Sequence, residues 1–557
     1  MQACDRATSE RFGVPSIELM HAASLAAASV VREQFPRARR VTVLCGTGNN
    51  GGDGMMTARL LADAGLDVAA LLLGEPEKLS GDAAQAWLEL NAPVVQSPEK
   101  TAAGHKTVLV VSAAEDLAKF DGALHADLIV DAIVGTGFHP PLRGLPLAAL
   151  EWVKAGAARY PVPILAVDLP SGWPADEGSA LMADAVFPAD AVVTFTAPKP
   201  AHVFGQLTRR WDQPVVVAPI GSPDEAVVSG LNVHWAGGAL ELVQTPRAAV
   251  ANKGNFGHVL VVGGTFGTAG GKAGAPAMTA MAALRSGAGL VTAAVPAPAL
   301  ALVSSFAPEL MTWPLAVNAA GCLTAESLIA EIMEPLMAGK TVLAFGPGLG
   351  QNPDTEKFAF GFLSDNKLPV VVDADGLNLL AQKPVLLARM AQVSTVVLTP
   401  HPGEMARLAG ISVAEVQADR LGVALGFAQR KGVIVVLKGA RTLIAHPDGR
   451  VAVNTSGNPG MAKGGSGDLL TGIVAGLMAQ YPQDVARAVE AAVYLHGLAA
   501  DLAVQTGDEH TLLATDALSH LSAAFRFPAF HFRSGSPNGY VWLQGALREA
   551  ALREGEQ

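Results

Sequence analysis

A glycine-rich stretch in the second half of the chain carries residues suited to phosphoryl transfer. In NPGMAKGGSGDLLTGIVAGL, residues 458–477, Asp468 follows a run of glycines, and an apolar helical pattern is expected from Leu469. Backbone N–H groups at a helix start can stabilise the charge on a transferring phosphoryl group. Asp468 can act as the general base that deprotonates an attacking hydroxyl; alternatively, it only caps the helix. The stretch predicts phosphoryl transfer to an alcohol.

A second set of polar residues lies just upstream of this stretch. VVLKGARTLIAHPDG places Lys438, Arg441 and Thr442 in an expected strand–turn–strand, where cationic and hydroxyl groups can meet nucleotide phosphates. The chain contains no GxxxxGK[ST] motif, so it is not a P-loop NTPase.

The first half of the chain has its own glycine-rich stretch. GTGNNGGDG, residues 46–54, lies between the apolar run VTVLC and the helical pattern MMTARLLADAG. A glycine-rich turn between a strand and a helix exposes backbone N–H groups to an anion such as a phosphate. Its glycines match the dinucleotide-binding spacing GxGxxG only in GTGNNG, so the motif alone is weak evidence.

Composition favours small-molecule chemistry. The formal net charge of -11 argues against nucleic-acid and anionic-membrane partners, which require a basic surface. The three cysteines, Cys4, Cys45 and Cys322, are odd in number and far apart, which is typical of a reducing compartment. Because the first residues are charged rather than apolar, no secretory signal is expected. We therefore expect a cytoplasmic protein, in which Cys45 is a core residue of an apolar strand.

The order of apolar runs predicts two α/β domains. Short β-branched runs that do not alternate with polar residues are typical of parallel strands covered on both faces. Residues 1–222 are predicted to form a Rossmann-like doubly wound domain, and residues 226–525 a second α/β domain. Ligands should bind where the strands end and the helices begin. The tail, residues 526–557, has no assigned role, although LREAALREG is compatible with an amphipathic helix.

The motifs together resemble a known family. GGKAGAPAMTAMAALRSGAGLVT, FGPGLG, DADGLN, LTPHPGE, LKGART and GNPGMAKGGSGDLLTG resemble, in this order, the ribokinase-like ADP-dependent NAD(P)H-hydrate dehydratases. GVPSIELMHAAS, CGTGNNGGDG, DAIVGTG and VDLPSG are similar to the NAD(P)H-hydrate epimerases. The whole chain therefore resembles the bifunctional NAD(P)H-hydrate repair enzymes, and the resemblance implies a ribokinase-like second domain.

The resemblance implies a repair reaction. NADH and NADPH that have added water at C6 of the nicotinamide ring (NADHX and NADPHX) exist as R and S epimers. The first domain would interconvert the epimers, and the second would dehydrate the S form with ADP as co-substrate, giving NAD(P)H, AMP and phosphate. The resemblance also implies K⁺ in the epimerase domain and Mg²⁺ in the dehydratase domain. We further expect a homo-oligomer.

The resemblance assigns residues in the dehydratase half. Asp468 would be the catalytic base that deprotonates the C6 hydroxyl. The hydrate would contact Ala275, Gly348, His401 and Asp468. ADP would be bound by Lys438, Gly439, Ala440, Arg441, Thr442, Asn458, Pro459, Gly460, Met461, Ala462, Lys463, Gly464, Gly465, Ser466 and Gly467. Without the motif around it, His401 would be read as a solvated loop residue.

The epimerase half receives a corresponding set. Asp168 in VDLPSG is the candidate acid/base at C6. The hydrate would contact Asn49, Asn50, Gly51, Gly52, Asp53, Gly135, Thr136, Gly137, Phe138, His139, Pro140, Pro141 and Asp168. The family's potassium site maps onto Asn50, Asp131 and Ser171, whose oxygen atoms suit a hard cation. From the residues alone, Asp131 would instead be read as a carboxylate that caps a loop.

Two departures and one rival function remain in view. His21 stands where the family usually has an acidic residue, and Arg143 is displaced from its usual neighbourhood, so full epimerase activity does not follow from the resemblance. Because the ribokinase fold also hosts other alcohol kinases, the alternative is a vitamin or sugar kinase fused to a non-catalytic dinucleotide-binding module.

Overall fold

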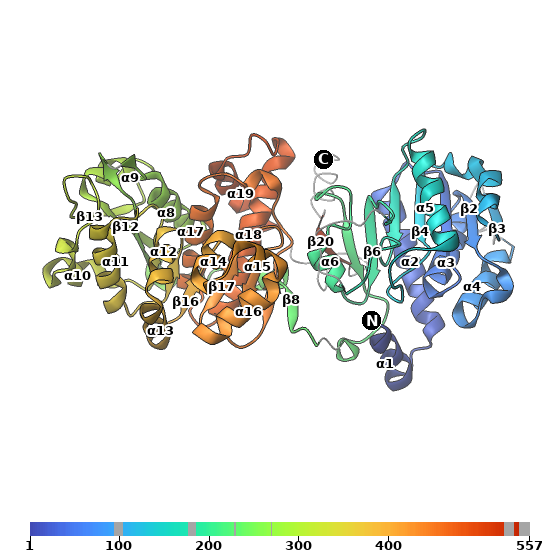
Figure 1. The fold of residues 1–557 in the computed structure, drawn as a ribbon, viewed down its shortest axis with the longest axis horizontal. Coiled ribbons are helices and arrows are strands. Elements are labelled where there is room, and N and C mark those ends of the chain that lie inside the picture. Colours follow the sequence, from blue (N-terminus) through green and yellow to red (C-terminus); the bar gives the residue numbers. More distant parts are fainter. Residues whose placement is uncertain (94–103, 177–184, 228–229, 269, 528–539, 545–557) are drawn as a thin grey trace. The chain divides into compact units, whose positions relative to one another are not determined.

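The computed structural model describes residues 1–557 except residues 94–103, 177–184, 228–229, 269, 528–539 and 545–557. The chain divides into two compact units (Figure 1). The first comprises Met1–Gly230 with Phe530–Gln557, and the second comprises Leu231–Ala529. Each unit is built around its own sheet.

The first unit contains a sheet with the strand order β3-β2-β1-β4-β5-β6-β7-β20. Its strands are β1 (Arg40–Cys45), β2 (Asp67–Leu73), β3 (Lys106–Val111), β4 (Leu128–Ala132), β5 (Ile164–Val167), β6 (Ala191–Phe195), β7 (Val215–Ala218) and β20 (Val541–Gln544). All neighbours are parallel except β20, which pairs antiparallel with β7. The predicted doubly wound fold is confirmed.

Helices cover both faces of this sheet. They are α1 (Gln2–Phe12), α2 (Ser16–Gln34), α3 (Asn49–Asp63), α4 (Gly81–Asn91), α5 (Gly144–Ala157) and α6 (Pro200–Phe204). In β1, Val41, Val43 and Cys45 enter a core shared with α2, α3 and α4, whereas Leu44 enters a core shared with α5. Side chains alternate across a strand, so two apolar cores require strands without polar alternation. Cys45 is a core residue, as predicted.

The glycine-rich stretch 46–54 allows a helix to lie very close to the sheet. Helix α3 begins at Asn49, within the stretch, rather than at the helical pattern that follows it. A Cβ on Gly51 would lie 1.9 Å from the backbone oxygen of Gly46, and one on Gly54 would lie 2.5 Å from the Cβ of Ala132. Most of these glycines are therefore required for packing against β1 and β4, in addition to any contact with an anion.

The second unit contains a sheet with the strand order β13-β12-β9-β14-β15-β16-β17-β18-β19-β8. Its strands are β8 (Val233–Trp235), β9 (His258–Val262), β12 (Leu290–Pro296), β13 (Met311–Leu315), β14 (Val342–Phe345), β15 (Val370–Val372), β16 (Val396–Leu398), β17 (Ile434–Leu437), β18 (Leu443–Ala445) and β19 (Val451–Val453). The pairs β17–β18 and β18–β19 are antiparallel. The strand–turn–strand of β17 and β18 was predicted, whereas β19 and the hairpin β10 (Phe266–Gly267) and β11 (Gly270–Gly271) were not expected from the sequence.

Helices α8 and α17 pack closely against each other in the second unit. Its helices are α7 (Leu240–Val243), α8 (Gly274–Arg285), α9 (Leu300–Ser304), α10 (Ala330–Met337), α11 (Pro353–Asp365), α12 (Asp375–Gln382), α13 (Pro384–Val393), α14 (Pro402–Ala409), α15 (Val413–Ala418), α16 (Arg420–Lys431), α17 (Ser466–Gln480), α18 (Val485–Thr506) and α19 (Ala514–Arg526). A Cβ on Gly472 of α17 would lie 2.1 Å from the backbone oxygen of Thr279 in α8. The hydroxyl of Thr279 donates to the backbone oxygen of Asp468 at 3.0 Å. The first turn of α17 is thus fixed to α8.

The tail after the second unit returns to the sheet of the first. Strand β20 lies beside β7, and Tyr540 and Leu543 are buried. This pairing could not be expected from the sequence, because two apolar residues in a short segment do not identify a partner strand. The predicted helix in LREAALREG lies outside the described residues.

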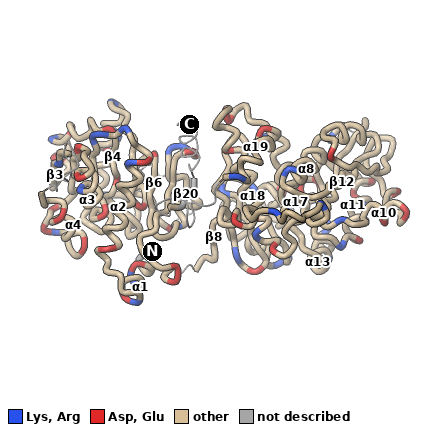
Figure 2. The backbone as a smooth tube through the Cα atoms, turned by 180° about the vertical axis from the view of Figure 1, so that it is seen from behind, with Lys and Arg blue, Asp and Glu red and all other residues tan. Residues whose placement is uncertain are grey.

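Charges of both signs are interspersed along each unit (Figure 2). No helix among the described residues is long and apolar enough to cross a membrane.

Candidate active sites

The first unit has a hollow at the switch point of its sheet. Strands β1 and β4 are neighbours, and the chain leaves them toward β2 on one side and β5 on the other. Doubly wound sheets bind ligands at such a point. The hollow measures about 910 Å³. Its lining includes the predicted residues Asn49, Asn50, Asp53, Gly135, Thr136, Gly137, Phe138, His139 and Asp168.

Four of the predicted substrate residues are not in this lining. Gly51 and Gly52 are buried in α3, where a side chain would collide with Gly46 and Met20. Pro140 and Pro141 are exposed, farther along the loop after β4. Glycine is needed at positions 51 and 52 because α3 packs closely there. These two residues therefore support the fold and make no side-chain contact with a ligand.

Asp168 is the centre of a buried polar network. Its Oδ1 lies 2.7 Å from Lys199 Nζ and accepts from the Thr194 hydroxyl at 2.9 Å. Its Oδ2 accepts from the backbone N–H of Thr136 at 3.2 Å. Burial alone would raise the pKa of Asp168, but the Lys199 charge and these hydrogen bonds lower it below the ordinary value. The carboxylate is therefore held ionised.

His202 fixes the backbone on both sides of this ion pair. Its Nδ1 accepts from the backbone N–H of Lys199 at 3.0 Å, so Nε2 carries the proton that is donated to the backbone oxygen of Asp168 at 2.7 Å. Burial and the Lys199 charge lower the pKa of His202 to about 4, so the ring is neutral. Asp168 has a φ of 66°, a left-handed conformation that this contact helps to hold.

The predicted potassium ligands lie beside the hollow. Ser171 Oγ donates to Asp131 Oδ1 at 2.6 Å and accepts from the backbone N–H of Val134 at 3.0 Å. A Cβ on Gly135 would lie 3.2 Å from the side-chain oxygen of Asn50. Burial raises the pKa of Asp131 to about 6, although its hydrogen bonds to Ser171 oppose this. Among the described residues, Asp131 has no cationic partner within 4 Å.

These residues fit a monovalent cation. The three side chains offer carboxylate, hydroxyl and amide oxygens, which are the donors that hard cations prefer. Asp131 is fully buried, and a buried charge without a counter-charge is unfavourable. A bound cation would supply the missing positive charge.

The two departures from the family pattern lie away from the hollow. His21 is on α2, where its Nε2 lies 3.1 Å from Glu89 of α4, and its side chain is 48% exposed. Arg143 is exposed and precedes the first residue of α5. Neither residue is part of the hollow's lining. The departures therefore do not alter the set of side chains that face a bound ligand.

The second unit also has a hollow at its switch point, between β9 and β14. This hollow measures about 530 Å³. All four predicted contacts of the hydrate, Ala275, Gly348, His401 and Asp468, are in its lining. They follow different strands of the sheet, so only the fold brings them together.

Asp468 is not a helix cap. Helix α17 begins at Ser466, three residues before the expected Leu469, and its N-cap is Gly465 with a φ of 95°. Asp468 lies in the first turn, and no side chain caps this helix. The capping interpretation is therefore wrong. Burial and the charge of Asp373 raise the pKa of Asp468 to about 6.

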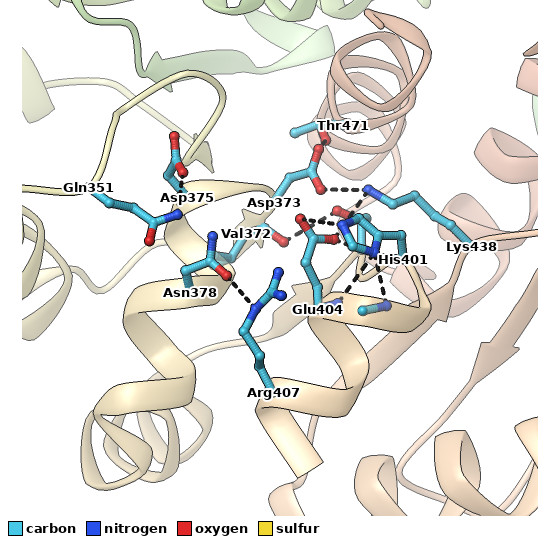
Figure 3. Close-up of polar contacts among 12 residues, drawn as sticks. Gln351, Val372, Asp373, Asp375, Asn378, His401, Glu404, Arg407, Lys438 and Thr471 are labelled. Atoms are coloured by element: carbon cyan, nitrogen blue, oxygen red, sulfur yellow. Dashed lines mark hydrogen bonds and ion pairs between the residues drawn. The ribbon is translucent and has the colours of Figure 1, made fainter. Parts of the chain in front are cut away.

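Lys438, a predicted ADP ligand, is held between two carboxylates (Figure 3). Its Nζ lies 2.8 Å from Asp373 Oδ1 and 3.8 Å from Glu404 Oε2, and the Thr471 hydroxyl donates to Asp373 Oδ2 at 2.9 Å. Burial would lower the pKa of Lys438, but the two carboxylates raise it above the ordinary value. A Cβ on Gly467 would lie 3.4 Å from the Lys438 Nζ. The ammonium group thus lies next to the glycine loop.

His401 is the N-cap of helix α14. Its Nδ1 accepts from the backbone N–H groups of Gly403 and Glu404 at 3.0 and 3.3 Å. Burial and the Lys438 charge lower the pKa of His401. The ring is therefore neutral at neutral pH, with its proton on Nε2, which can donate to a ligand in the hollow. The His401 side chain is 52% exposed, as its interpretation as a solvated loop residue implies, but the ring also caps α14 and lines the hollow.

The predicted nucleotide residues 438–442 form the turn between β17 and β18, as the sequence predicted. The Thr442 hydroxyl donates to the backbone oxygen of Gly439 at 2.9 Å. Arg441 has a φ of 56° and donates from Nη1 to the backbone oxygen of Thr455 at 3.1 Å. Arg441 thus ties this turn to the strand end that leads into the second nucleotide loop.

The second nucleotide loop, residues 458–467, is held by helix α18. The carboxylate of Asp501 accepts from the backbone N–H of Gly457 at 2.8 Å and from the amide of Asn458 at 2.9 Å. Burial raises the pKa of Asp501 to about 7. The loop ends at the N-terminus of α17, where backbone N–H groups are available to a phosphate.

Sequence reasoning missed the partners of the predicted residues. Lys199 lies four residues after the end of the apolar run DAVVTF, and a lysine in the loop that follows a buried strand was a usable signal. Asp373 and Glu404 stand in DADGLN and LTPHPGE, two of the motifs that carry the family resemblance. Arg407 had no such signal, because a single arginine on an amphipathic helix is usually solvated.

Comparison with known proteins gives matches over both units. The family model described as NAD(P)H-hydrate dehydratase matches residues 259–523, and the one described as YjeF-related protein N-terminus matches residues 16–201. The chain is 41% identical over 536 residues to the bifunctional NAD(P)H-hydrate repair enzyme Nnr of Moorella thermoacetica, with 94% of this chain and 95% of the relative covered.

Two further matches were found, one to a relative and one to a solved structure. The bifunctional NAD(P)H-hydrate repair enzyme Nnr of Coxiella burnetii is 37% identical over 515 residues, with 91% of this chain and 95% of the relative covered. A crystal structure of ADP/ATP-dependent NAD(P)H-hydrate dehydratase from Bacillus subtilis is 30% identical and covers 52% of this chain and 96% of that chain, with a TM-score of 0.43.

Proposed function

Since the chain belongs to the family of bifunctional NAD(P)H-hydrate repair enzymes, we propose that it restores hydrated NADH and NADPH in two steps. The first unit interconverts the R and S epimers of the hydrate. The second unit dehydrates the S epimer with ADP and releases NAD(P)H, AMP and phosphate. Full-length similarity favours this function over a vitamin or sugar kinase joined to a binding module.

In the second unit, Asp468 is the general base of phosphoryl transfer. It removes the proton of the C6 hydroxyl, and the hydroxyl oxygen attacks the terminal phosphorus of ADP, so that AMP leaves. The lone pair of the ring nitrogen then expels phosphate from C6, and loss of a proton from C5 restores the double bond. A pKa of about 6 suits this role, because the carboxylate is ionised at neutral pH and still basic enough to accept a proton.

The nucleotide is held by the two loops that include Lys438–Thr442 and Asn458–Gly467. The backbone N–H groups at the start of α17 and the charged Lys438 stabilise the negative charge of the transferring phosphoryl group. Mg²⁺ would be bound by the phosphates of the nucleotide and would enter the site with it. The described residues offer no cluster of three or more His, Cys, Asp or Glu side chains that could hold a metal by itself.

In the first unit, Asp168 acts at the C6 hydroxyl of either epimer. Its Oδ2 takes the hydroxyl proton while the bond between C6 and the ring nitrogen opens, and the proton returns after the ring recloses on the other face. Lys199 keeps Asp168 ionised before the transfer. Potassium held by Asn50, Asp131 and Ser171 would supply a fixed positive charge beside the hollow.

One observation carries the proposal. Residues 275, 348, 401 and 468, which lie far apart in the sequence, line a single hollow, and the carboxylate among them is free of any capping role. A general base, a neutral imidazole and the N-terminus of a helix then face the same space. This is the set of groups that phosphorylation and departure of a ring hydroxyl require.

The test uses the full chain, because β20 from the C-terminal segment belongs to the first sheet and truncation would remove it. The chain is incubated with ADP and each purified epimer, and the absorbance of the reduced nicotinamide and the release of AMP are followed. We expect both epimers to be consumed, and Asp168→Asn to retain turnover of the S epimer only.

Three outcomes would contradict the proposal in different ways. Release of a stable phosphorylated compound without recovery of NADH would indicate a kinase. Consumption of the R epimer at its spontaneous rate would remove the epimerase assignment alone. If the S epimer yields neither AMP nor reduced nicotinamide, the dehydratase assignment is wrong.

A further inference from the structure

The hollow that contains Asp468 continues into a second one. The second hollow measures about 450 Å³ and is lined by Gln351, Asn378, Ala381, Gln382 and Arg407. Asn378 and Arg407 line both hollows, so the two meet at these side chains. Neither lining includes residues 439–442 or 458–467, which we assign to ADP. The second hollow therefore has no role in the reaction as described so far.

Arg407 differs from the other cations of the site. Lys272 lies 3.4 Å from Asp375, and Lys438 lies 2.8 Å from Asp373. Arg407 has no carboxylate partner within 4 Å among the described residues, although it is the cation at the junction of the two hollows. Glu404 interacts with the Arg407 charge only from beyond ion-pair distance, so the guanidinium is available to an anionic ligand.

The guanidinium of Arg407 is nevertheless held in place. Its Nε donates to Asn378 Oδ1 at 2.8 Å, and Asn378 is on α12 whereas Arg407 is on α14. Figure 3 shows the guanidinium pointing into the space between Asn378 and Glu404. This single hydrogen bond leaves the two terminal amino groups, which are the pair that binds phosphate oxygens in a bidentate manner. The side chain is thus oriented in advance for an anion.

We propose that Arg407, held by Asn378, binds the diphosphate bridge of the hydrated dinucleotide, and that the second hollow receives its adenosine half. This inference rests on the proposed dehydratase function. A dinucleotide is two nucleosides joined through two phosphates, so a site that holds the nicotinamide half at Asp468 needs a cation at the bridge and a second space beyond it. The two hollows and Arg407 have this order.

The test compares two substrates that differ in whether they have a bridge. Arg407→Gln is assayed on the full chain with the S hydrate of NADH and with hydrated reduced nicotinamide riboside, which has no phosphate. We expect kcat/KM to fall about 10- to 100-fold for the dinucleotide, mainly through KM, because charged hydrogen bonds to phosphate are lost. We expect no change for the riboside and no change in the KM for ADP.

Two further variants separate the bridge from the adenosine half. Ala381→Trp fills the second hollow and should raise KM for the dinucleotide but not for the riboside. Arg389→Gln on α13 is the matched control, because Arg389 is exposed and lines neither hollow. Equal loss for both substrates in Arg407→Gln, or no loss for either, would overturn the inference.

A binding measurement keeps this inference distinct from the proposed function. Titration calorimetry with the hydrate of NADH needs no turnover, and the dinucleotide site of the first unit serves as an internal reference. We expect Arg407→Gln to weaken one of two sites. If the wild type binds the hydrate through Arg407 but gives no AMP with ADP, the proposed function fails and this inference stands. If Arg407→Gln binds at both sites like the wild type, this inference fails.

Discussion

The hollow of the first unit, at Asp168, and that of the second unit, at Asp468, differ in how a lysine–aspartate pair relates to the candidate catalytic carboxylate. Each lies at the switch point of a parallel sheet, and each unit has a lysine–aspartate ion pair near its hollow: Lys199–Asp168 in the first and Lys438–Asp373 in the second. In the first unit the paired aspartate is the candidate acid/base itself, Asp168. In the second unit Lys438 pairs with Asp373, and the candidate base Asp468 forms no ion pair with any residue that the structure describes.

The difference in pairing explains the difference in pKa. Lys199 lowers the pKa of Asp168 against the effect of burial, whereas burial and Asp373 raise the pKa of Asp468 to about 6. Asp468 is therefore suited to complete removal of a proton from an alcohol. Asp168 suits a reversible opening of the ring, in which the proton is held only briefly. A lysine–aspartate pair at a sheet switch point does not by itself identify the catalytic carboxylate.

The largest expected effect is that of Asp468→Asn. Because the general base is lost while the loop amides remain, ADP-dependent dehydration of the S epimer should fall by roughly 10²-fold or more. The rate of epimerisation, measured in quenched time-course assays, and the affinity for ADP, measured by titration calorimetry, should be unchanged. Asp508→Asn, which changes an exposed aspartate, is the control. Retained turnover in Asp468→Asn would show that the base lies elsewhere.

The next effect concerns stability and is confined to the first unit. Lys199→Met leaves Asp168 buried without its counter-charge, which should lower the free energy of unfolding of this unit by about 3–5 kcal/mol. Lys119→Met breaks an exposed pair with Asp116 in the same unit and should lower the free energy of unfolding far less, because solvent screens exposed ion pairs. Denaturant unfolding, monitored by hydrogen exchange in each unit, measures the change in the free energy of unfolding for both variants. Equal losses for the two variants would argue against a buried ion pair at Asp168.

The sequence predicted most of the fold and only half of each site. Apolar runs predicted the seven parallel strands of the first sheet, because strands buried on both faces have a plain signature. Strand β20 could not be predicted, since its partner is set by an edge more than 300 residues away in the sequence. Strand β19, which pairs antiparallel with β18, escaped notice because it is only three residues long.

The same limit applies to the site residues. Motif positions located Asp168, Asp468 and His401, because resemblance is read along the chain. Lys199 and Arg407 are recognised through what they contact or fail to contact, and these relations exist only after folding. The neutral state of His202 likewise follows from its burial and from the nearby Lys199 charge, and not from its place in the sequence.

A smaller effect concerns pH. Dehydration requires ionised Asp468, so its rate should fall as the pH decreases through about 6. Asp373→Asn removes a charge that raises this pKa and leaves Lys438, which lowers it, so the acid limb of the kcat profile should move to lower pH. Glu404→Gln also alters a partner of Lys438 but should leave the limb near pH 6. A limb that moves upward in Asp373→Asn would contradict the electrostatic coupling.

The smallest effect is expected at His21, where the chain departs from the pattern of its relatives. The His21–Glu89 contact is about half exposed on both sides and lies outside the hollow, so it contributes at most about 1 kcal/mol to stability. His21→Ala and His21→Glu should therefore epimerise the R hydrate at the wild-type rate, in contrast to Asp168→Asn. Turnover of the R epimer is measured for the three variants. It compares changes at the exposed His21 with a change in the buried network around Asp168. A marked gain of activity in His21→Glu would mean that the first unit is weakened at α2, and that its hollow alone does not determine its rate.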